Sequence, residues 1–440
     1  MRIRRTVLMI VVTASAWLCA EGAMAAQANT AKAEEVLQSW YKLSLELVWH
    51  TPTYSPPVAS RSFAYLGVTA FEAVATGSTE LQTLAGQLHG LKPGPQRQTG
   101  KTYDEGVVVQ AAMAFSVKSF FNNTGPTGHH VMAALEAKLR ADVAKGVPVK
   151  VVARSEAYGR AVAKHILAWS KDDGGAVVEN MGFPMDYELT KGPPHWIPTN
   201  LIIQQQKPLL PYWGKNRTFV MPEGTSCALP PPPEYSEDKN SEFYKQALEV
   251  YEAKLNSTPE HRAIARFWAD DAMLSMTPPG HWISIALQIF KRDNVELDKS
   301  VDVLVRLGVA EADAFIGCWQ AKYQYDLVRP ISYIRRVIDP KWEPLLNTPP
   351  FPEYPSGHST QSGASATVLT NLFGENFAFQ DETGKPAGLA PRSFTSFWEA
   401  ANDAGISRMY GGIHFRAAIE RGLEQGRCIA AFTNALQTKR

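Results

Sequence analysis

Apolar residues recur at three- and four-residue spacing along most of the chain, which is the pattern of amphipathic helices. In the first half this spacing predicts helices over residues 32–49, 58–75, 102–121, 128–145 and 150–171. In the second half it predicts helices over 241–256 and 259–275, one that begins near His281, and further helices over 299–326, 358–373, 394–409 and 414–436. No alternation of strands and helices accompanies them. The predicted fold class is therefore all-α, built from helical bundles.

Residues 172–240 interrupt the helical pattern. They contain Pro193-Pro194 and the run Pro230–Pro233, and they carry isolated aromatic residues such as Trp196 and Trp213. The segment is too long for a simple loop and too aromatic for a flexible linker. We expect an ordered, proline-rich excursion that wraps the helical core and includes a short hairpin.

These patterns predict four parts of the chain. Residues 1–25 form a signal peptide, 26–175 an N-terminal helical half, 176–240 the proline-rich connection, and 241–440 a C-terminal helical half. A chain of 440 residues is long enough to bury a substantial core.

The first 25 residues have the features of an export signal. Arg2, Arg4 and Arg5 form a basic start, residues 6–20 are mostly apolar, and Ala23-Met24-Ala25 is a small-x-small cleavage site. We expect this segment to be removed and the mature protein to be exported, either to a periplasm or to the medium.

Charge excludes some classes of partner. Removing residues 1–25 takes away three arginines and one glutamate, so the formal net charge changes from +1 to −1. A nearly neutral chain has no electrostatic basis for binding nucleic acid or an anionic membrane surface. No second apolar run is long enough to span a bilayer. We expect a soluble mature protein.

Cysteine usage indicates neither a disulfide scaffold nor a zinc site. Three cysteines, Cys227, Cys318 and Cys428, remain after signal removal. An oxidising compartment would permit one disulfide among them, and the odd count leaves no complete framework. Neither C-x-x-C nor H-E-x-x-H spacing occurs, so the ligand patterns typical of zinc are missing.

Candidate chemistry concentrates in the last third of the chain. Lys322 and Arg329 straddle the predicted end of a long helix, which Pro330 stops and redirects. Ser356-Gly357-His358 precedes a helical stretch of small residues. Backbone amides at such a helix start, with a glycine that permits close approach, are suited to an oxyanion.

A third segment completes the set. Arg408 offers a planar fork of donors that suits a tetrahedral oxyanion, and His414 follows six residues later. With His358, this places two histidines beside three cations. One histidine can attack or ligate the central atom, and the other can move protons. Each residue alone is commonplace, but their joint order indicates a pocket for a phosphate-shaped oxyanion.

This ordered set resembles the superfamily of vanadium-dependent haloperoxidases and type 2 phosphatidic acid phosphatases, which includes bacterial acid phosphatases. The motifs cover about residues 319–420. The resemblance implies that the equatorial oxygens of the oxyanion are bound by Lys322, Arg329, Ser356, Gly357 and Arg408. It also implies that His414 is the axial ligand to vanadium, or the phosphoryl nucleophile of a phosphatase. His358 would then be the acid–base group at the opposite apex.

Further similarities favour the haloperoxidase branch, with exported bacterial vanadium chloroperoxidase-like proteins as the nearest match in appearance. Trp319 and Phe351 are similar to aromatic residues beside the halide site of fungal-type vanadium chloroperoxidases, although core packing explains them equally well. The segment around Trp268 resembles one in which an aspartate, here Asp271, pairs with the oxyanion-binding arginine, here Arg408. The long helical N-terminal half also resembles exported haloperoxidases.

One position departs from the pattern. Many relatives have an aspartate four residues after the second histidine, where it can orient the imidazole, and here that position is Ala418. A nucleophilic histidine needs an orienting partner. Glu420 lies on the wrong helix face for a simple replacement, and a backbone carbonyl is one alternative. The departure weakens the phosphatase hypothesis more than the haloperoxidase hypothesis.

Three functions follow from the resemblance. The first is a vanadate-dependent haloperoxidase, with vanadate as cofactor and with hydrogen peroxide, halide and an organic acceptor as small-molecule substrates. The second is an exported acid phosphatase that acts through a phospho-histidine at His414. The third is a non-catalytic phosphate- or vanadate-binding protein, for which a lost His358 or His414 would be the signature, and both are present.

Overall fold

The computed structural model describes residue 30 and the ranges 32–178, 182–184, 186–199 and 207–440. The predicted signal segment, 1–25, lies outside the described residues. Within these ranges, no helix combines the length and the apolar character needed to cross a membrane.

The fold is all-α, as predicted. The first half contains a helix over 32–49, α2 (Pro56–Ala75), α3 (Glu105–Phe120), α4 (Pro126–Ala144), α5 (Val149–Ser170) and α6 (Gly175–Val178). The second half contains α7 (Glu242–Leu255), α8 (Pro259–Phe267), α9 (Thr277–Asp293), α10 (Leu297–Tyr325), α11 (Pro330–Val337), α12 (Gly357–Phe373), α13 (Phe397–Tyr410) and α14 (Arg416–Asn434). Short pieces complete the chain: the 3₁₀ turns η2 (Trp213–Lys215) and η3 (Lys385–Ala387), and the strands β1 (Phe379–Asp381) and β2 (Arg392–Phe394).

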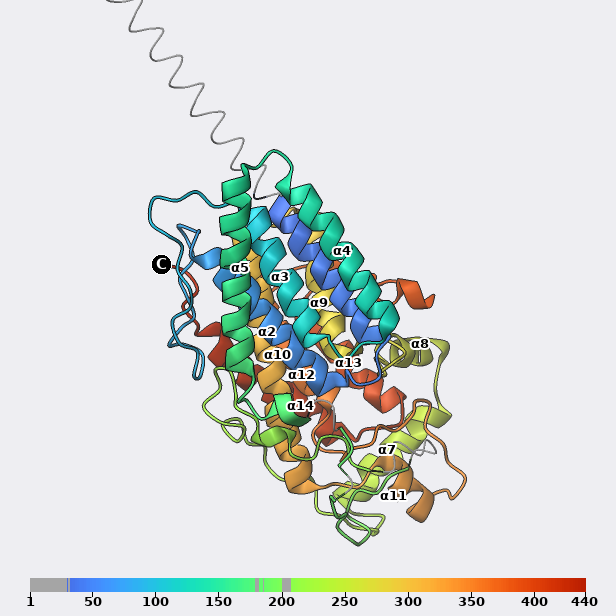
Figure 1. Cartoon of the computed structure of the whole chain (residues 1–440). Helices are drawn as coiled ribbons and strands as arrows, with labels where there is room; N and C mark the ends of the chain where they lie inside the picture. The colour runs from blue at the N-terminus through green and yellow to red at the C-terminus, as the bar shows by residue number, and fades with distance from the viewer. Residues whose placement is uncertain (1–29, 31, 179–181, 185, 200–206) are drawn as a thin grey trace, which may run out of the picture.

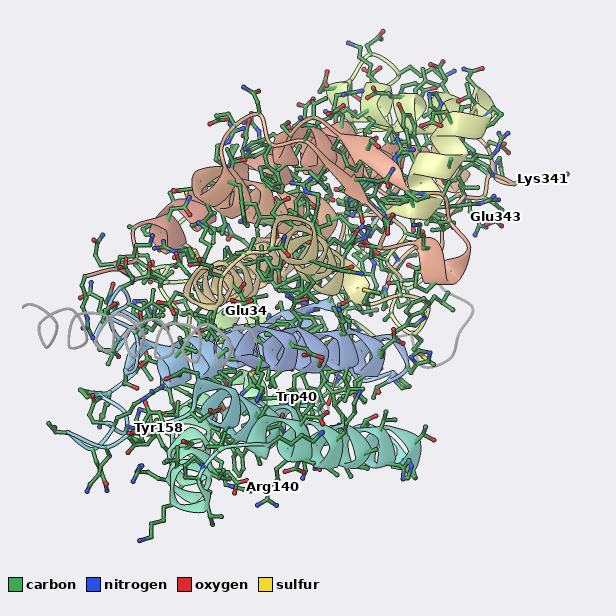
Figure 2. All side chains as sticks on the ribbon, turned by 90° about the horizontal axis from the view of Figure 1, so that it is seen from above. Glu34, Trp40, Arg140, Tyr158, Lys341 and Glu343 are labelled. Atoms are coloured by element: carbon green, nitrogen blue, oxygen red, sulfur yellow. A yellow bond between two sulfur atoms is a disulfide. The ribbon has the colours of Figure 1, made fainter. Side chains whose placement is uncertain are left out.

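Helices α2 and α10 form the centre of the molecule, because both are buried along almost their whole length. Figure 1 shows α2 to α5 side by side, with α7 and α11 at the lower end of the molecule. One hydrophobic cluster includes residues of both predicted halves, from Trp40 in the first helix to Leu436 near the C-terminus. In Figure 2, Trp40 lies inside the molecule and Arg140 on its outer surface. The division into halves stays a prediction.

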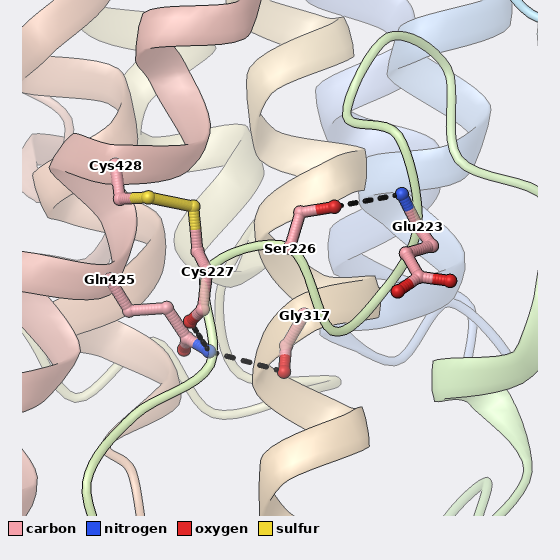
Figure 3. Close-up of a disulfide and its surroundings, with 6 residues drawn as sticks. All are labelled: Glu223, Ser226, Cys227, Gly317, Gln425 and Cys428. Atoms are coloured by element: carbon pink, nitrogen blue, oxygen red, sulfur yellow. Dashed lines mark hydrogen bonds between the residues drawn. A yellow bond between two sulfur atoms is a disulfide. The ribbon is translucent and has the colours of Figure 1, made fainter.

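The proline-rich connection is attached to the C-terminal helices. Cys227 forms a disulfide with Cys428 on α14, across a separation of 201 residues (Figure 3). Beside it, the side-chain amide of Gln425 donates to the carbonyl oxygens of Cys227, at 3.4 Å, and of Gly317, at 3.3 Å. Cys318 remains a buried free thiol. The connection therefore leads the chain directly over α10 and α14.

Two predicted elements differ from the structure. The helix predicted over 259–275 ends at Phe267, and Asp270 and Met273 beyond it adopt the left-handed conformation at φ 47° and 68°. The hairpin expected in the proline-rich connection is not found in the described part of that segment, where His195 forms an isolated bridge with Leu327. The antiparallel pair lies instead between β1 and β2.

Candidate functional site

The predicted oxyanion-binding residues come from the ends of four helices. Lys322 lies in the last turn of α10, and Arg329 occupies the N-cap position of α11. Ser356 caps the start of α12, and Arg408 lies in the last turn of α13. His414 sits in the short connection that leads into α14. The ends of these helices thus bring together the three sequence segments that carry the predicted oxyanion-binding residues.

Close packing of α14 on α12 sets the distance between His414 and the start of α12. A Cβ atom at Gly422 would lie 2.9 Å from the Ser356 carbonyl oxygen, and one at Gly426 only 2.0 Å from that of Thr360. Only glycine fits at such an approach of two helices. The amide of Ser356 also donates to the carbonyl oxygen of Ala418 at 3.0 Å. Ala418, which stands where an aspartate was expected, therefore helps to hold the start of α12 through its backbone carbonyl.

The cationic side chains of the site are almost completely buried. Lys322 and Arg329 are 0% exposed and Arg408 is 1% exposed. Burial disfavours the charged form and lowers the pKa of Lys322 to about 7 and the pKa of each arginine to about 10. Buried charge of one sign is costly unless an opposite charge compensates it. The pocket is therefore suited to an anion.

Glu353 orients His414. Its Oε1 atom accepts from the Nδ1–H of His414 at 2.8 Å and from the backbone amide of Phe415 at 2.8 Å. Because Nδ1 carries the proton, the lone pair is on Nε2, which accepts from Arg329 Nη1 at 3.1 Å. Burial, followed by the charges of Arg329 and Lys322, lowers the pKa of His414 well below its ordinary value. His414 is thus a neutral imidazole, and Nε2, whose lone pair accepts from Arg329 in this structure, is the atom that can act as a ligand or nucleophile.

His358 lies against the backbone of Trp268 and Ala269. Its Nε2 atom is buried and has no hydrogen-bond partner among the described residues. Burial and the neighbouring charges of Arg408 and His281 lower its pKa well below the ordinary value. A neutral imidazole with an unpartnered nitrogen can accept a proton from a bound molecule.

Arg408 is held by a backbone carbonyl rather than by Asp271. Its Nη1 atom donates to the Trp268 carbonyl oxygen, and no ion pair between Arg408 and Asp271 occurs among the described residues. The expected direct pair is therefore not formed, because residues 268–276 leave the helical path. Asp271 still acts on Arg408 through its charge and opposes the lowering of the arginine pKa. Burial raises the pKa of Asp271 itself to about 6.

Lys322 is inside the cluster, but its donors are occupied. Its Nζ atom donates to the carbonyl oxygens of Pro352, at 2.9 Å, of Glu353, at 3.0 Å, and of Pro355. An ammonium group has three donors, so Lys322 holds the segment before α12 in place. Its predicted contact with an oxyanion stays a prediction.

Ser356 and Gly357 form the start of α12. Ser356 Oγ accepts from the Ser359 amide at 3.2 Å and so caps the helix. The first amides of a helix have no partner within it. A Cβ atom at Gly357 would meet only ordinary contacts, the nearest being the Trp319 ring at 3.7 Å. Packing against the protein therefore does not require glycine there.

Trp319 and Phe351 form an aromatic pair beside the cations. Their ring centroids are 4.9 Å apart. The Phe351 centroid lies 5.1 Å from Lys322 Nζ and 5.1 Å from Arg329 Cζ. The Trp319 indole donates to the Leu209 carbonyl oxygen at 3.2 Å. The two rings thus cover one side of the cationic cluster, and their halide role stays a prediction.

Unpartnered buried atoms test whether the site fits vanadate. Within the described ranges, Arg329 Nη2, Arg408 Nε and His358 Nε2 are buried without a hydrogen-bond partner. Each such buried polar atom costs free energy unless a further group satisfies it. The two arginine donors suit the oxygens of a tetrahedral anion. The described residues contain no group of three or more His, Cys, Asp or Glu that could hold a bare metal ion. The site therefore fits an oxyanion such as vanadate or phosphate.

A wide, open cavity lies elsewhere. It measures about 840 Å³ and is lined by Pro230–Pro233, Tyr354, Arg416 and neighbouring residues of α7 and α14. None of the predicted oxyanion-binding residues lines it. The donor geometry, and not cavity size, therefore identifies the candidate site.

Two features in and beside the site were not recognised from the sequence. Glu353 stands in the proline- and aromatic-rich run before Ser356, where a lone carboxylate was the available signal. His281 forms ion pairs with Asp270 and Asp381 beside the pocket. Asp381 lies in β1, for which no pattern was recognised.

Known proteins are similar to this chain in sequence and in fold. A family model, the VCPO second helical-bundle domain, matches residues 302–439. The vanadium chloroperoxidase of Curvularia inaequalis is 27% identical over 47% of this chain, and the match spans only 45% of that protein's length. A bacterial vanadium-dependent iodoperoxidase of known crystal structure is 39% identical to this chain in sequence. The two structures superpose with a TM-score of 0.85 over 92% of this chain and 97% of that chain. A holo-type bacterial vanadium-dependent chloroperoxidase, 18% identical, shares the fold with a TM-score of 0.67 over 88% of this chain and 93% of that chain.

Proposed function

The chain belongs to the vanadium-dependent haloperoxidases, and from this premise we propose that it binds vanadate and oxidises halide with hydrogen peroxide to hypohalous acid. The observation that carries the proposal is the state of His414. Glu353 holds its Nδ1–H at 2.8 Å, so Nε2 presents a lone pair beside Arg329. A ligand histidine is commonly fixed in this way by a second hydrogen bond.

Each residue of the site has a separate task in this function. Vanadate, when bound, supplies the activation of peroxide toward halide. Nε2 of His414 is the protein ligand. The unpartnered donors of Arg329 and Arg408 bind and neutralise the oxyanion oxygens. His358 accepts a proton at Nε2 and returns it.

Vanadium analysis and paired assays test this proposal. The purified chain is equilibrated with orthovanadate, dialysed, and analysed for vanadium content. It is then assayed with hydrogen peroxide and iodide, bromide or chloride, and separately with a phosphate monoester. We expect one vanadium per chain and halide oxidation that depends on it. Retained vanadium without oxidation of any halide, or no retention at all, would contradict the proposal.

Phosphate-ester hydrolysis is a second candidate, and Glu353 is the observation that favours it. The missing aspartate at Ala418 argued against a nucleophilic histidine, but Glu353 supplies the orienting carboxylate from another segment. The same cations would bind phosphate. Phosphatase activity of the vanadate-free protein, lost in His414→Ala and inhibited by vanadate, would support this function.

We also infer that the protein is exported. The basic and apolar pattern of residues 1–25 supports this inference. The disulfide between Cys227 and Cys428 is consistent with it, because disulfides persist mainly in oxidising compartments. Fractionation of cells that express the full chain, with N-terminal sequencing of the product, tests export. A cytoplasmic product that retains residue 1 would contradict it.

A further inference from the structure

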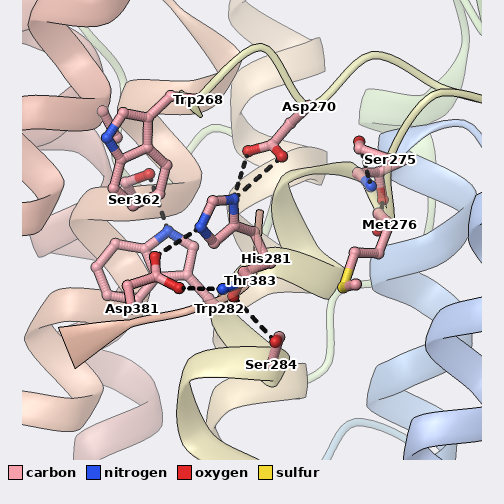
Figure 4. A network of polar contacts seen from close by, with 12 residues as sticks. Trp268, Asp270, Ser275, Met276, His281, Trp282, Ser284, Ser362, Asp381 and Thr383 are labelled. Atoms are coloured by element: carbon pink, nitrogen blue, oxygen red, sulfur yellow. Dashed lines mark hydrogen bonds and ion pairs between the residues drawn. The ribbon is translucent and has the colours of Figure 1, made fainter. Parts of the chain in front are cut away.

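A buried cluster of one histidine and two aspartates lies beside the oxyanion site. Nδ1 of His281, on α9, lies 3.1 and 3.0 Å from the two carboxylate oxygens of Asp270, and its Nε2 lies 2.7 Å from Asp381 Oδ2 (Figure 4). All three side chains are buried. We call these residues, Asp270, His281 and Asp381, the histidine–aspartate cluster.

His281 carries a positive charge in this cluster. Both of its ring nitrogens face carboxylate oxygens, and an imidazole donates from both nitrogens only when it is protonated. Burial alone would lower the pKa of His281, but the charges of Asp270 and Asp381 outweigh burial and raise it to about 10. The imidazolium thus links two segments that are 111 residues apart in sequence, between Asp270 and Asp381.

The segment that His281 holds is conformationally strained. Asp270 and Thr277 adopt the left-handed conformation, and for a β-branched residue such as Thr277 this is unfavourable. Strain of this kind persists only where the surroundings fix the backbone, and it is concentrated at functional sites. The Trp268 ring stacks on His281, with centroids 4.4 Å apart and planes 19° apart. Its indole donates to Asp403 at 2.9 Å.

The same segment contacts the oxyanion-binding residues. The Trp268 carbonyl oxygen accepts from Arg408 Nη1. The His358 ring lies against the backbone of Trp268 and Ala269, and the charge of Asp271 acts on Arg408. A shift of this segment would therefore move the arginine fork and the acid–base histidine together.

We propose that His281 is a positioning residue that, through Asp270 and Asp381, holds residues 268–271 against Arg408 and His358 and so sets the affinity of the site for a tetrahedral oxyanion. The inference rests on the proposed function, because it assigns a role in binding the same anion. His281 does not touch the anion in this role. It acts through the Trp268 carbonyl and the stacked indole.

The variant His281→Gln tests the proposal, because a glutamine cannot donate charged hydrogen bonds to both carboxylates. The matched control is Asp302→Asn, which removes the charge of another buried ion pair, Asp302 with Arg306 at 2.8 Å. Asp302 lies about five helical turns before Lys322 on α10. For the parent and both variants, the Kd for orthovanadate is measured by equilibrium dialysis with elemental analysis. The melting temperature is measured on the same samples. The KM for halide is measured at saturating vanadate.

We expect His281→Gln to raise the vanadate Kd by about 10- to 100-fold, as for other residues that support a ligand shell, with an unchanged KM for halide. Asp302→Asn should lower the melting temperature and leave the Kd unchanged. Equal Kd values for parent and His281→Gln would overturn the proposal, as would an equal rise in Asp302→Asn. If His281→Gln does not fold, the Kd for orthovanadate is measured on Asp381→Asn instead. A smaller rise in Kd is expected for this variant, because a neutral acceptor forms a weaker hydrogen bond with His281. Absence of vanadate binding by the parent would instead contradict the proposed function itself.

Discussion

Glu353 Oε1 accepts the Nδ1 proton of His414 at 2.8 Å. This contact comes from a segment that precedes α12, whereas His414 leads into α14, so it depends on the packing of the two helices. It determines which nitrogen of His414 carries the lone pair. The orientation of the proposed ligand therefore rests on one buried carboxylate.

Replacing Glu353 should weaken vanadate binding without removing the ligand. In Glu353→Ala the imidazole loses its hydrogen-bond acceptor, and the Kd for orthovanadate should rise by about 10- to 100-fold. Glu353→Gln is the matched control, because its side-chain oxygen can still accept from Nδ1, and a smaller rise is expected. Equilibrium dialysis measures both. Equal affinities for the alanine variant and the parent would remove Glu353 from this role.

His414→Ala should abolish tight retention of vanadium. The imidazole Nε2 is the proposed direct ligand of vanadium, and alanine has no lone pair that could take its place. The arginine donors remain, so weak and rapidly reversible binding of the anion is expected to survive. Vanadium content after extensive dialysis distinguishes the two states. Parent-like stoichiometry in the variant would exclude His414 as the ligand.

Phosphate should compete with vanadate, because the buried cations and unpartnered donors suit any tetrahedral oxyanion. The apparent Kd for vanadate should rise linearly with phosphate concentration. Sodium chloride at equal ionic strength is the control for general screening. Weak anion binding has a Kd of the order of millimolar, so phosphate is added at about that concentration. Vanadate binding that is unchanged by this phosphate would contradict a shared site.

The contribution of His281 to stability should depend on pH. Burial opposes the charged form, but Asp270 and Asp381 raise its pKa to about 10 in the folded protein, against about 6.5 when unfolded. A raised folded pKa contributes stability that is complete below about pH 6.5 and is lost as pH rises toward 10. Besides the two aspartates, the ionisable groups near this region include His358, Arg408, Asp271 and Asp403, the last through the Trp268 indole.

Urea unfolding of the parent and of His281→Gln at several pH values measures this contribution. The difference in unfolding free energy should be largest near pH 6 and should shrink toward pH 10, because only the parent loses a charge from the cluster. Groups that titrate identically in both proteins cancel in the difference. A difference that stays constant across this range would show that His281 is not charged in the folded protein.

Local sequence patterns predicted most of the helices, because apolar spacing reports a buried face directly. The break after Phe267 was missed because the apolar spacing continues through Trp268, while the change of direction comes from left-handed residues such as Asp270. No glycine or proline marks that point in the sequence. Tertiary contacts, among them the ion pair with His281, hold the backbone there.

Residues of the candidate site that stand in recognisable motifs could be named from the sequence. Residues whose contacts depend on helix packing could not. Lys322, Arg329, Ser356, Arg408 and both histidines could be named because basic and small residues stand in a fixed order. Glu353 could not be assigned, since its role appears only when α12 and α14 come together. The occupied donors of Lys322 likewise depend on the path of the segment before α12.

The variant His358→Ala separates proton transfer from vanadate binding. Its Nε2 is buried and unpartnered, and burial with the charge of Arg408 keeps the imidazole neutral. A neutral histidine can take a proton from peroxide, and such assistance is worth about 10²- to 10⁴-fold in rate. His358→Ala should therefore retain vanadate, somewhat more weakly, and lose turnover by a factor in this range.

A purely structural role for His358 predicts a different result. If the side chain served only to begin α12, its loss would lower stability and leave turnover per bound vanadium unchanged. The structure already assigns the cap of α12 to Ser356, whose Oγ accepts from the Ser359 amide at 3.2 Å. Melting temperature, vanadium content and peroxide-dependent kinetics on one preparation distinguish the roles. A variant that melts lower but turns over normally would exclude catalysis by His358, whereas normal melting with slow turnover would establish proton transfer as its task.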